Sequence, residues 1–184
     1  LIVTDPKVSK STFFESFIND RETGYVVYHW VKSDPTVQQA EEIAEFYRKN
    51  ECDSFIAIGG GSAIDAAKGA AACIARPGKV LMNMRGLMRV KRETPFFIAV
   101  PTTAGTGSET TSIAVLSDNA TGQKFAINDP HLMPDVAVLD PSLLISLPKE
   151  ETAYTGMDAL THAVEAYMNT PFHLDDTAED CEDA

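Results

Sequence analysis

The stretch SFIAIGGGSAIDAAKGAAACIA at residues 54–75 decides the fold. Its first part is a continuous apolar run that predicts a buried strand, and the glycines that follow predict a tight turn. Ser62 and Asp65, three residues apart, resemble a capping box at the start of an alanine-rich helix. A strand that passes through a glycine turn straight into a helix is typical of parallel α/β sheets.

Apolar runs on both sides of this stretch continue the alternation of strands and helices. The predicted strands are LIVTD at 1–5, YVVYHWV at 25–31, FFIAVP at 96–101 and VAVLD at 136–140, and the predicted helices cover 9–19 and 35–50. TTSIAVLS and QKFAI flank the turn signal DNATG and predict a hairpin, whereas residues 76–95 predict loop or weak helix. This order predicts an α/β fold with a doubly wound, mostly parallel, Rossmann-like sheet.

The pattern changes at Pro148, where strand signals stop and a helical pattern begins. We therefore expect an α/β dinucleotide-binding domain over 1–148 and the first helix of an all-helical domain over 149–184. Because the chain opens inside a predicted strand, we expect the first domain to be incomplete at its N-terminus and the second to be truncated.

Composition narrows the class of protein. The chain has 184 residues, 44% of them hydrophobic and 23% charged, as in an ordinary globular protein. A net charge of -12 with no Lys or Arg stripe argues against nucleic-acid and membrane partners, and no apolar run approaches the roughly 20 residues of a membrane span. We expect a cytoplasmic protein with idle thiols at Cys52, Cys73 and Cys181, and a solvated acidic segment at 175–183.

The GGGS turn predicts a phosphate site. A strand that ends at Gly59, Gly60 and Gly61 and enters a helix leaves backbone N–H groups unpaired, and the helix dipole adds positive potential. Glycine is needed there because a Cβ would hold a phosphate away from the backbone. The alternative is a simple tight turn.

The loop PTTAGTGSE follows a second predicted strand in the same way. Its hydroxyls belong to Thr102, Thr103, Thr106 and Ser108, and they either wrap a polar ligand or cap their own backbone. Two such loops at the carboxyl ends of parallel strands are better explained by one dinucleotide bound in the crevice there. Asp5 ends the first strand at that edge, where a carboxylate would accept hydrogen bonds from a ribose and repel a 2′-phosphate, which favours NAD over NADP.

The segment TAYTGMDALTHAVEAY predicts a helix with a metal-binding face. Asp158 and His162 are one turn apart on that face with Glu165 beside them, while Ala159, Leu160, Ala163, Val164 and Tyr167 form an apolar stripe. A carboxylate and an imidazole so placed can bind one divalent cation, or can simply form a surface ion pair. Since a catalytic metal usually has three protein ligands, the remaining ones are expected outside this chain. The other histidines, His29, His131 and His173, are not evidently placed to serve as the missing metal ligands.

The strings GGGSAIDAAKG, PTTAGTGSE and TGMDALTHAVEAY, in this order and near these spacings, resemble the iron-containing alcohol dehydrogenase family. The resemblance runs from LIVTD to about Tyr167. It implies an active site between an α/β domain and a helical domain, and a metal, Fe2+ in preference to Zn2+, held by one Asp and three His. Asp158 and His162 match the first two of these ligands and are the implied catalytic pair.

The resemblance also implies the cofactor contacts. These are Asp5, Asp34, Gly60, Gly61, Ser62, Asp65, Thr102, Thr103, Thr106 and Lys124. At 33–36 the chain reads SDPT where the family often has NPT, so Asp34 replaces an amide near the cofactor.

The implied reaction is reversible hydride transfer between an alcohol and NAD(P), with a bound metal stabilising the alkoxide. The expected partners are a small alcohol or aldehyde and further copies of the chain in a homo-oligomer. The alternatives are an enzyme of the dehydroquinate synthase or glycerol dehydrogenase type or, for this chain alone, a nucleotide-binding module without turnover.

Overall fold

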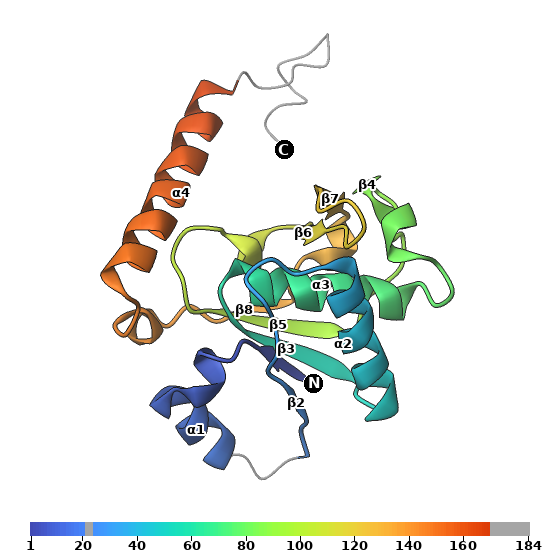
Figure 1. Ribbon diagram of the computed structural model, residues 1–184, viewed down its shortest axis with the longest axis horizontal. Helices are drawn as coiled ribbons and strands as arrows, with labels where there is room; N and C mark the ends of the chain where they lie inside the picture. The colour runs from blue at the N-terminus through green and yellow to red at the C-terminus, as the bar shows by residue number, and fades with distance from the viewer. Residues whose placement is uncertain (21–23, 170–184) are drawn as a thin grey trace, which may run out of the picture.

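A five-stranded parallel sheet lies at the centre of the computed structural model, which describes residues 1–20 and 24–169 (Figure 1). The strands lie in the order β2-β1-β3-β5-β8, and every neighbouring pair is parallel. They are β1 (Ile2–Thr4), β2 (Val27–Tyr28), β3 (Ser54–Gly59), β5 (Phe96–Pro101) and β8 (Val136–Ala137). The predicted fold class is confirmed.

Helices cover both faces of this sheet. Because successive strand residues point to opposite faces, Phe55 and Ala57 of β3 join one hydrophobic core and Ile58 joins the other. Helices α2 (Val37–Lys49) and α3 (Gly61–Ala75) pack in the first core, and α1 (Thr12–Asn19) packs in the second through Phe14. The sheet is therefore doubly wound, as expected.

A smaller sheet lies over α3 on the side away from the main sheet (Figure 1). It contains β4 (Gly86–Leu87), β6 (Ile113–Ser117) and β7 (Lys124–Asn128) in the order β4-β7-β6, and the antiparallel pairing of β6 with β7 confirms the predicted hairpin. A Cβ on Gly69 would lie 2.9 Å from both Ala40 Cβ and Leu116 Cδ1, so glycine lets α2, α3 and β6 approach closely. Eleven of the fifteen residues of α3 are buried between these layers.

Some predicted boundaries are wrong. The strands expected at 25–31 and 136–140 shorten to two residues each, because only two residues of β2 pair with β1 and only two residues of β8 pair with β5. The helix expected at 9–19 divides into a short 3-10 helix, η1 (Val8–Lys10), and α1. The other 3-10 helices are η2 (Leu81–Met84), η3 (Ser108–Thr110), η4 (Pro130–Leu132) and η5 (Pro141–Leu144).

Helix α4 (Lys149–Met168) begins directly after Pro148, as predicted, and extends away from the main sheet (Figure 1). None of its residues is buried against the described part of the chain, and its apolar stripe is exposed, with Leu160 at 56% and Val164 at 45%. Within 1–20 and 24–169, no helix has both the length and the apolar character needed to cross a bilayer. The acidic segment at 175–183, His173 and Cys181 fall outside the described residues.

Candidate cofactor and metal site

The carboxyl ends of β1, β3 and β5 lie side by side at one edge of the main sheet. Thr4 is in register with Ile58, and Gly59 is in register with Pro101. The amide of Thr102 donates a 3.0 Å hydrogen bond to the carbonyl oxygen of Gly59. The segments that follow these strands therefore start next to one another, as the sequence predicts.

The glycine turn and the threonine loop are in direct contact. A Cβ on Gly60 would lie 3.2 Å from both Cγ2 and Oγ1 of Thr103, and one on Gly61 would lie 2.8 Å from Cγ2 of Thr106. A Cβ at Gly61 would therefore require Thr106 to shift, and a Cβ at Gly60 would crowd Thr103. Gly60 is the N-cap of α3 and offers no side-chain cap, so the first amides of the helix remain available to a ligand.

The predicted capping box of Ser62 and Asp65 is wrong. Because α3 begins at Gly61, Ser62 already lies in its first turn, and its hydroxyl donates to the carbonyl oxygen of Ser33. Asp65 lies on the buried face of α3 and accepts hydrogen bonds from the hydroxyl of Ser108 (2.9 Å) and the amide of Val115 (3.1 Å). Both side chains join α3 to neighbouring segments and leave the helix end uncapped.

The sequence predicts that the threonine loop either binds a polar ligand or caps its own backbone, and its threonine hydroxyls give evidence for both. Thr106 Oγ1 accepts a 3.3 Å hydrogen bond from the amide of Ser108, which fits a loop that caps its own backbone. Thr103 Oγ1 is buried and has no hydrogen-bond partner in the described part of the chain. An unpaired buried hydroxyl costs about 1–3 kcal/mol, and a phosphate beside Gly60 would supply the acceptor.

Asp5 uses one carboxylate oxygen for local structure. Its Oδ1 accepts hydrogen bonds from the amides of Lys7 (2.8 Å) and Val8 (3.0 Å) and fixes the turn into η1. Its Oδ2 faces the glycine turn, 3.3 Å from the point where a Cβ of Gly59 would lie. One oxygen of Asp5 is therefore directed toward the predicted cofactor edge.

A hollow of about 520 Å³ joins this edge to α4. Eight of the predicted site residues line it: Asp34, Gly61, Ser62, Asp65, Thr106, Lys124, Asp158 and His162. Four others lie outside its lining, at the adjacent strand ends: Asp5, Gly60, Thr102 and Thr103. The structure thus brings the predicted cofactor residues and the predicted metal pair to one region.

The base of α4 is fixed against the threonine loop. A Cβ on Gly105 would lie 2.4 Å from the carbonyl oxygen of Thr155, so only glycine permits this approach. Lys7, just before η1, also forms an ion pair with Glu151 in the first turn of α4. These contacts orient the helix that carries Asp158 and His162.

Asp158 and His162 have the spacing of a shared cation site. Asp158 Oδ1 lies 3.7 Å from His162 Nε2. Because a metal–ligand bond is about 2.1 Å long, one cation between these two atoms can bind both. Both side chains are about half exposed, and as an ion pair alone they would contribute about 0–1 kcal/mol. Within the described residues, no group of three or more His, Cys, Asp or Glu side chains is placed to hold a metal ion.

Lys124 and Asp34, both predicted cofactor contacts, bind each other at the mouth of the hollow. Lys124 Nζ lies 2.7 Å from Asp34 Oδ1, and both side chains are more than 60% exposed. A cofactor contact by either residue therefore competes with this ion pair.

Sequence reasoning missed the role of Lys68. Its ammonium group is buried and donates hydrogen bonds to the carbonyl oxygens of Ser108 (2.6 Å), Ile113 (3.0 Å) and Thr111. Burial lowers the pKa of Lys68 to about 8, and burial also raises the pKa of Asp65. The signal was present in the sequence, since Asp65 and Lys68 are the only charged residues inside an alanine-rich helix.

The chain is similar in sequence to known proteins along most of its length. Residues 1–141 match the family described as iron-containing alcohol dehydrogenase. The chain is 40% identical over 173 residues to alcohol dehydrogenase 4 of Schizosaccharomyces pombe, covering 92% of this chain and 41% of that protein. It is also 40% identical over 171 residues to the NAD-dependent methanol dehydrogenase of Bacillus methanolicus, covering 91% of this chain and 45% of that protein.

A solved structure shows the same architecture. The sulfoacetaldehyde reductase of Bifidobacterium kashiwanohense, in complex with NAD+, matches with a TM-score of 0.78 and 35% identity, covering 90% of this chain and 45% of that one. The chain thus spans less than half the length of the curated relatives it matches. On this evidence the chain belongs to the iron-containing alcohol dehydrogenase family.

Proposed function

We propose that this chain carries the cofactor-binding part of a metal-dependent, NAD-linked dehydrogenase that interconverts an alcohol and an aldehyde or ketone. The observation that carries the proposal is the single hollow that borders both the first turn of α3 and the pair Asp158 and His162. The NAD-dependent relative and the NAD+ complex of a structural neighbour support NAD as the cofactor.

In this proposal the amides of Gly60 and Gly61 and the hydroxyl of Thr103 hold the diphosphate of the cofactor. Asp5 binds the adenosine ribose and repels a 2′-phosphate, which favours NAD over NADP. The other proposed cofactor contacts are Asp34, Ser62, Asp65, Thr102, Thr106 and Lys124. Asp158 and His162 would hold a divalent metal, Fe2+ in preference to Zn2+, which when bound stabilises an alkoxide as a Lewis acid.

We further propose that α4 is the first helix of a helical domain that supplies the remaining metal ligands and much of the substrate contact. The exposed apolar stripe of α4 supports this division at Pro148, because such a stripe is expected to be buried by packing. With two metal donors, the 184-residue chain should bind NAD without turnover. The homo-oligomeric and cytoplasmic state expected from the sequence remains a prediction.

Calorimetric titration of the 184-residue chain with NAD+ and NADP+ tests the cofactor site. We expect NAD+ to bind more tightly, and Thr103→Val to weaken NAD+ binding about tenfold, because it removes one hydrogen bond to a charged group. Thr121→Val, in the turn between β6 and β7, is the matched control and should leave binding unchanged. Tighter binding of NADP+, or no difference between the two variants, would count against the site.

An activity assay tests the proposal that a helical domain supplies the remaining metal ligands. The purified chain with Fe2+, NAD+ and a short-chain alcohol should form no NADH. Metal-dependent alcohol oxidation by this chain would show that two donors are sufficient and would refute the proposed helical contribution.

A further inference from the structure

Positive charge is concentrated in one short segment of this acidic protein. The chain carries 15 Lys and Arg residues and a net charge of -12, yet residues 76–92 contain no acidic residue. Their cations are Arg76, Lys79, Arg85, Arg89, Lys91 and Arg92. The sequence shows no basic stripe because these residues follow no helical or strand period, and only folding brings some of them together.

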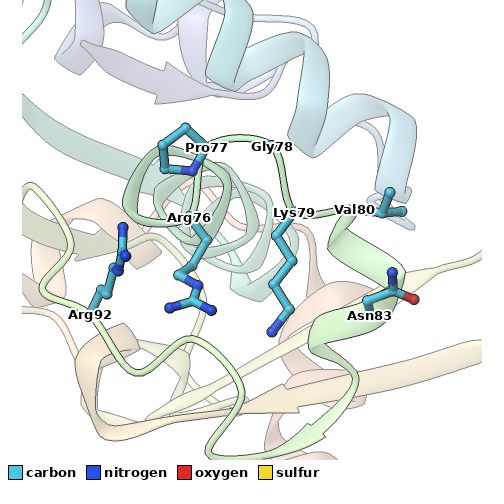
Figure 2. A pocket seen from close by; sticks show the side chains of 7 residues that line it. All are labelled: Arg76, Pro77, Gly78, Lys79, Val80, Asn83 and Arg92. Carbon is cyan, nitrogen blue, oxygen red and sulfur yellow. The ribbon is translucent and has the colours of Figure 1, made fainter.

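Three of these cations line a second hollow, of about 380 Å³, at the end of α3 that lies away from the glycine turn. Figure 2 shows Arg92, Arg76 and Lys79 in a row along this hollow, with Asn83 farther along it. Arg76 is the C-cap of α3, and the amide of Lys79 donates to the carbonyl oxygen of Arg76 (3.1 Å) across a turn that contains Gly78 at φ 80°. This turn places Lys79 beside Arg76.

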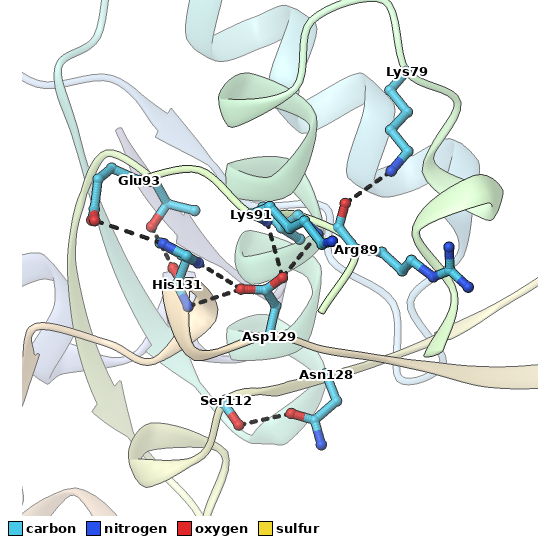
Figure 3. A network of polar contacts seen from close by, with 10 residues as sticks. Lys79, Arg89, Lys91, Glu93, Ser112, Asn128, Asp129 and His131 are labelled. Carbon is cyan, nitrogen blue, oxygen red and sulfur yellow. Dashed lines mark hydrogen bonds and ion pairs between the residues drawn. The ribbon is translucent and has the colours of Figure 1, made fainter. Parts of the chain in front are cut away.

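Arg92 follows a loop that is anchored to the body of the protein. Asp129 is fully buried and accepts hydrogen bonds from the amides of Val90 (2.9 Å) and Lys91 (3.0 Å) and from the ring of His131 (2.6 Å). Figure 3 shows Asp129 between Lys91 and His131. Lys79 Nζ donates a 2.8 Å hydrogen bond to the carbonyl oxygen of Arg89, which ties this loop to the turn after α3. The ammonium group of Lys79 and the backbone just before Arg92 are therefore held in place before any ligand binds, which lowers the cost of binding.

In the part of the chain that the structure describes, no carboxylate pairs with this cluster. Among residues 1–20 and 24–169, none of Arg76, Lys79 and Arg92 forms an ion pair. Desolvation and the neighbouring cations, Arg76 foremost, lower the pKa of Lys79, the direction that mutual repulsion produces. A bound anion would relieve this repulsion.

We propose that this hollow is a second binding site, for a diphosphate group. Two guanidinium groups can each bind phosphate oxygens in a bidentate manner, and the Lys79 ammonium adds a point charge between them and Asn83. The 15 residues of α3, at about 1.5 Å each, separate the hollow from the glycine turn by about 22 Å. A diphosphate bound here is therefore not that of the dinucleotide in the proposed cofactor site. Free inorganic diphosphate and a nucleoside diphosphate share the chemistry that this site recognises.

Titration of the 15N-labelled 184-residue chain with inorganic pyrophosphate and, separately, with ADP tests this site by NMR. We expect saturable shifts of the amides at 76–80 and 92, distinct from any response at 59–62. Arg76→Gln with Arg92→Gln should weaken binding at least about tenfold, and Lys79→Gln alone should weaken it severalfold, since each removes a charge-assisted hydrogen bond. Equal affinity for the two probes would identify the diphosphate alone as the ligand group, whereas tighter ADP binding would identify a nucleotide; either supports the site.

The matched control is Lys10→Gln with Lys149→Gln, which removes the same charge from two exposed lysines outside both hollows. Its affinity should stay within about twofold of that of the unmodified chain. The site is refuted if pyrophosphate shifts only residues at 59–62 and 102–106, if no shift saturates, or if the two double variants weaken binding equally. The amides at 76–80 and 92 report on this hollow and those at 59–62 report on the proposed cofactor site. A lack of diphosphate binding here can therefore be distinguished from a lack of cofactor binding there.

Discussion

Replacing Gly105 by alanine should disrupt the contact that positions the metal-binding helix. The new Cβ would lie 2.4 Å from the carbonyl oxygen, 2.9 Å from the carbonyl carbon and 3.0 Å from Cα of Thr155. These are backbone atoms, so no side-chain rotation can relieve the clash, and the loop or α4 must move by about 1 Å. Overpacking of this kind costs about 1–3 kcal/mol.

Gly156→Ala is the matched control, because a Cβ there would meet no atom within 4 Å. Urea unfolding should show that Gly105→Ala lowers the free energy of unfolding by about 1–3 kcal/mol, whereas Gly156→Ala leaves it unchanged or raises it by up to about 1 kcal/mol through helix propensity. The amide signals of Thr155 to His162 should shift in the Gly105 variant, although this helix is some fifty residues away in sequence. Equal stabilities of the two variants, with α4 signals unmoved by Gly105→Ala, would refute the docking of α4 on the loop.

Two further substitutions test the buried charges. Lys68→Met should lower the free energy of unfolding by about 3–5 kcal/mol in urea, since it leaves the buried Asp65 carboxylate and three carbonyl oxygens without their cation, whereas Lys49→Met, at the exposed end of α2, should change it by less than about 0.5 kcal/mol. A loss below about 1 kcal/mol for Lys68→Met would contradict this role. Burial raises the pKa of Asp129, but hydrogen bonds from His131, Lys91 and Val90 outweigh this and leave the pKa below its usual value. Its ionised form therefore stabilises the fold above the unfolded pKa of about 3.9, and this contribution is lost as the pH falls through the lower folded pKa. Asp129→Asn should thus lower the free energy of unfolding by about 1–3 kcal/mol at pH 7, with a difference that shrinks below pH 4; a difference independent of pH would contradict the assignment.

The sequence predicts the central architecture because its signals there are local. The apolar run at 54–58 predicts a strand, the three glycines predict a turn and the alanine-rich segment predicts a helix, each from its own residues. Parallel strands then necessarily bring their carboxyl ends to one edge of the sheet. The juxtaposition of the two loops follows from that topology and was predictable.

The remaining features depend on tertiary packing. Ser62 and Asp65 have the spacing of a capping box, but α3 begins at Gly61, so Ser62 lies inside the helix and bonds to Ser33, while Asp65 lies on the buried face and bonds to Ser108. The basic hollow combines a helix end with a loop anchored by Asp129, and no periodicity relates the two segments. The edge strands are shorter than their apolar runs because each pairs with its neighbouring strand over two residues only.

A crystal structure of the 184-residue chain soaked with NAD+ tests most directly whether the glycine turn and the threonine loop bind one diphosphate. We predict that the cofactor diphosphate lies against the amides of Gly60 and Gly61 and accepts a hydrogen bond from Thr103 Oγ1, with the nicotinamide ring directed toward Asp158 and His162. A cofactor bound away from these two loops, or a nicotinamide directed away from α4, would contradict the proposal.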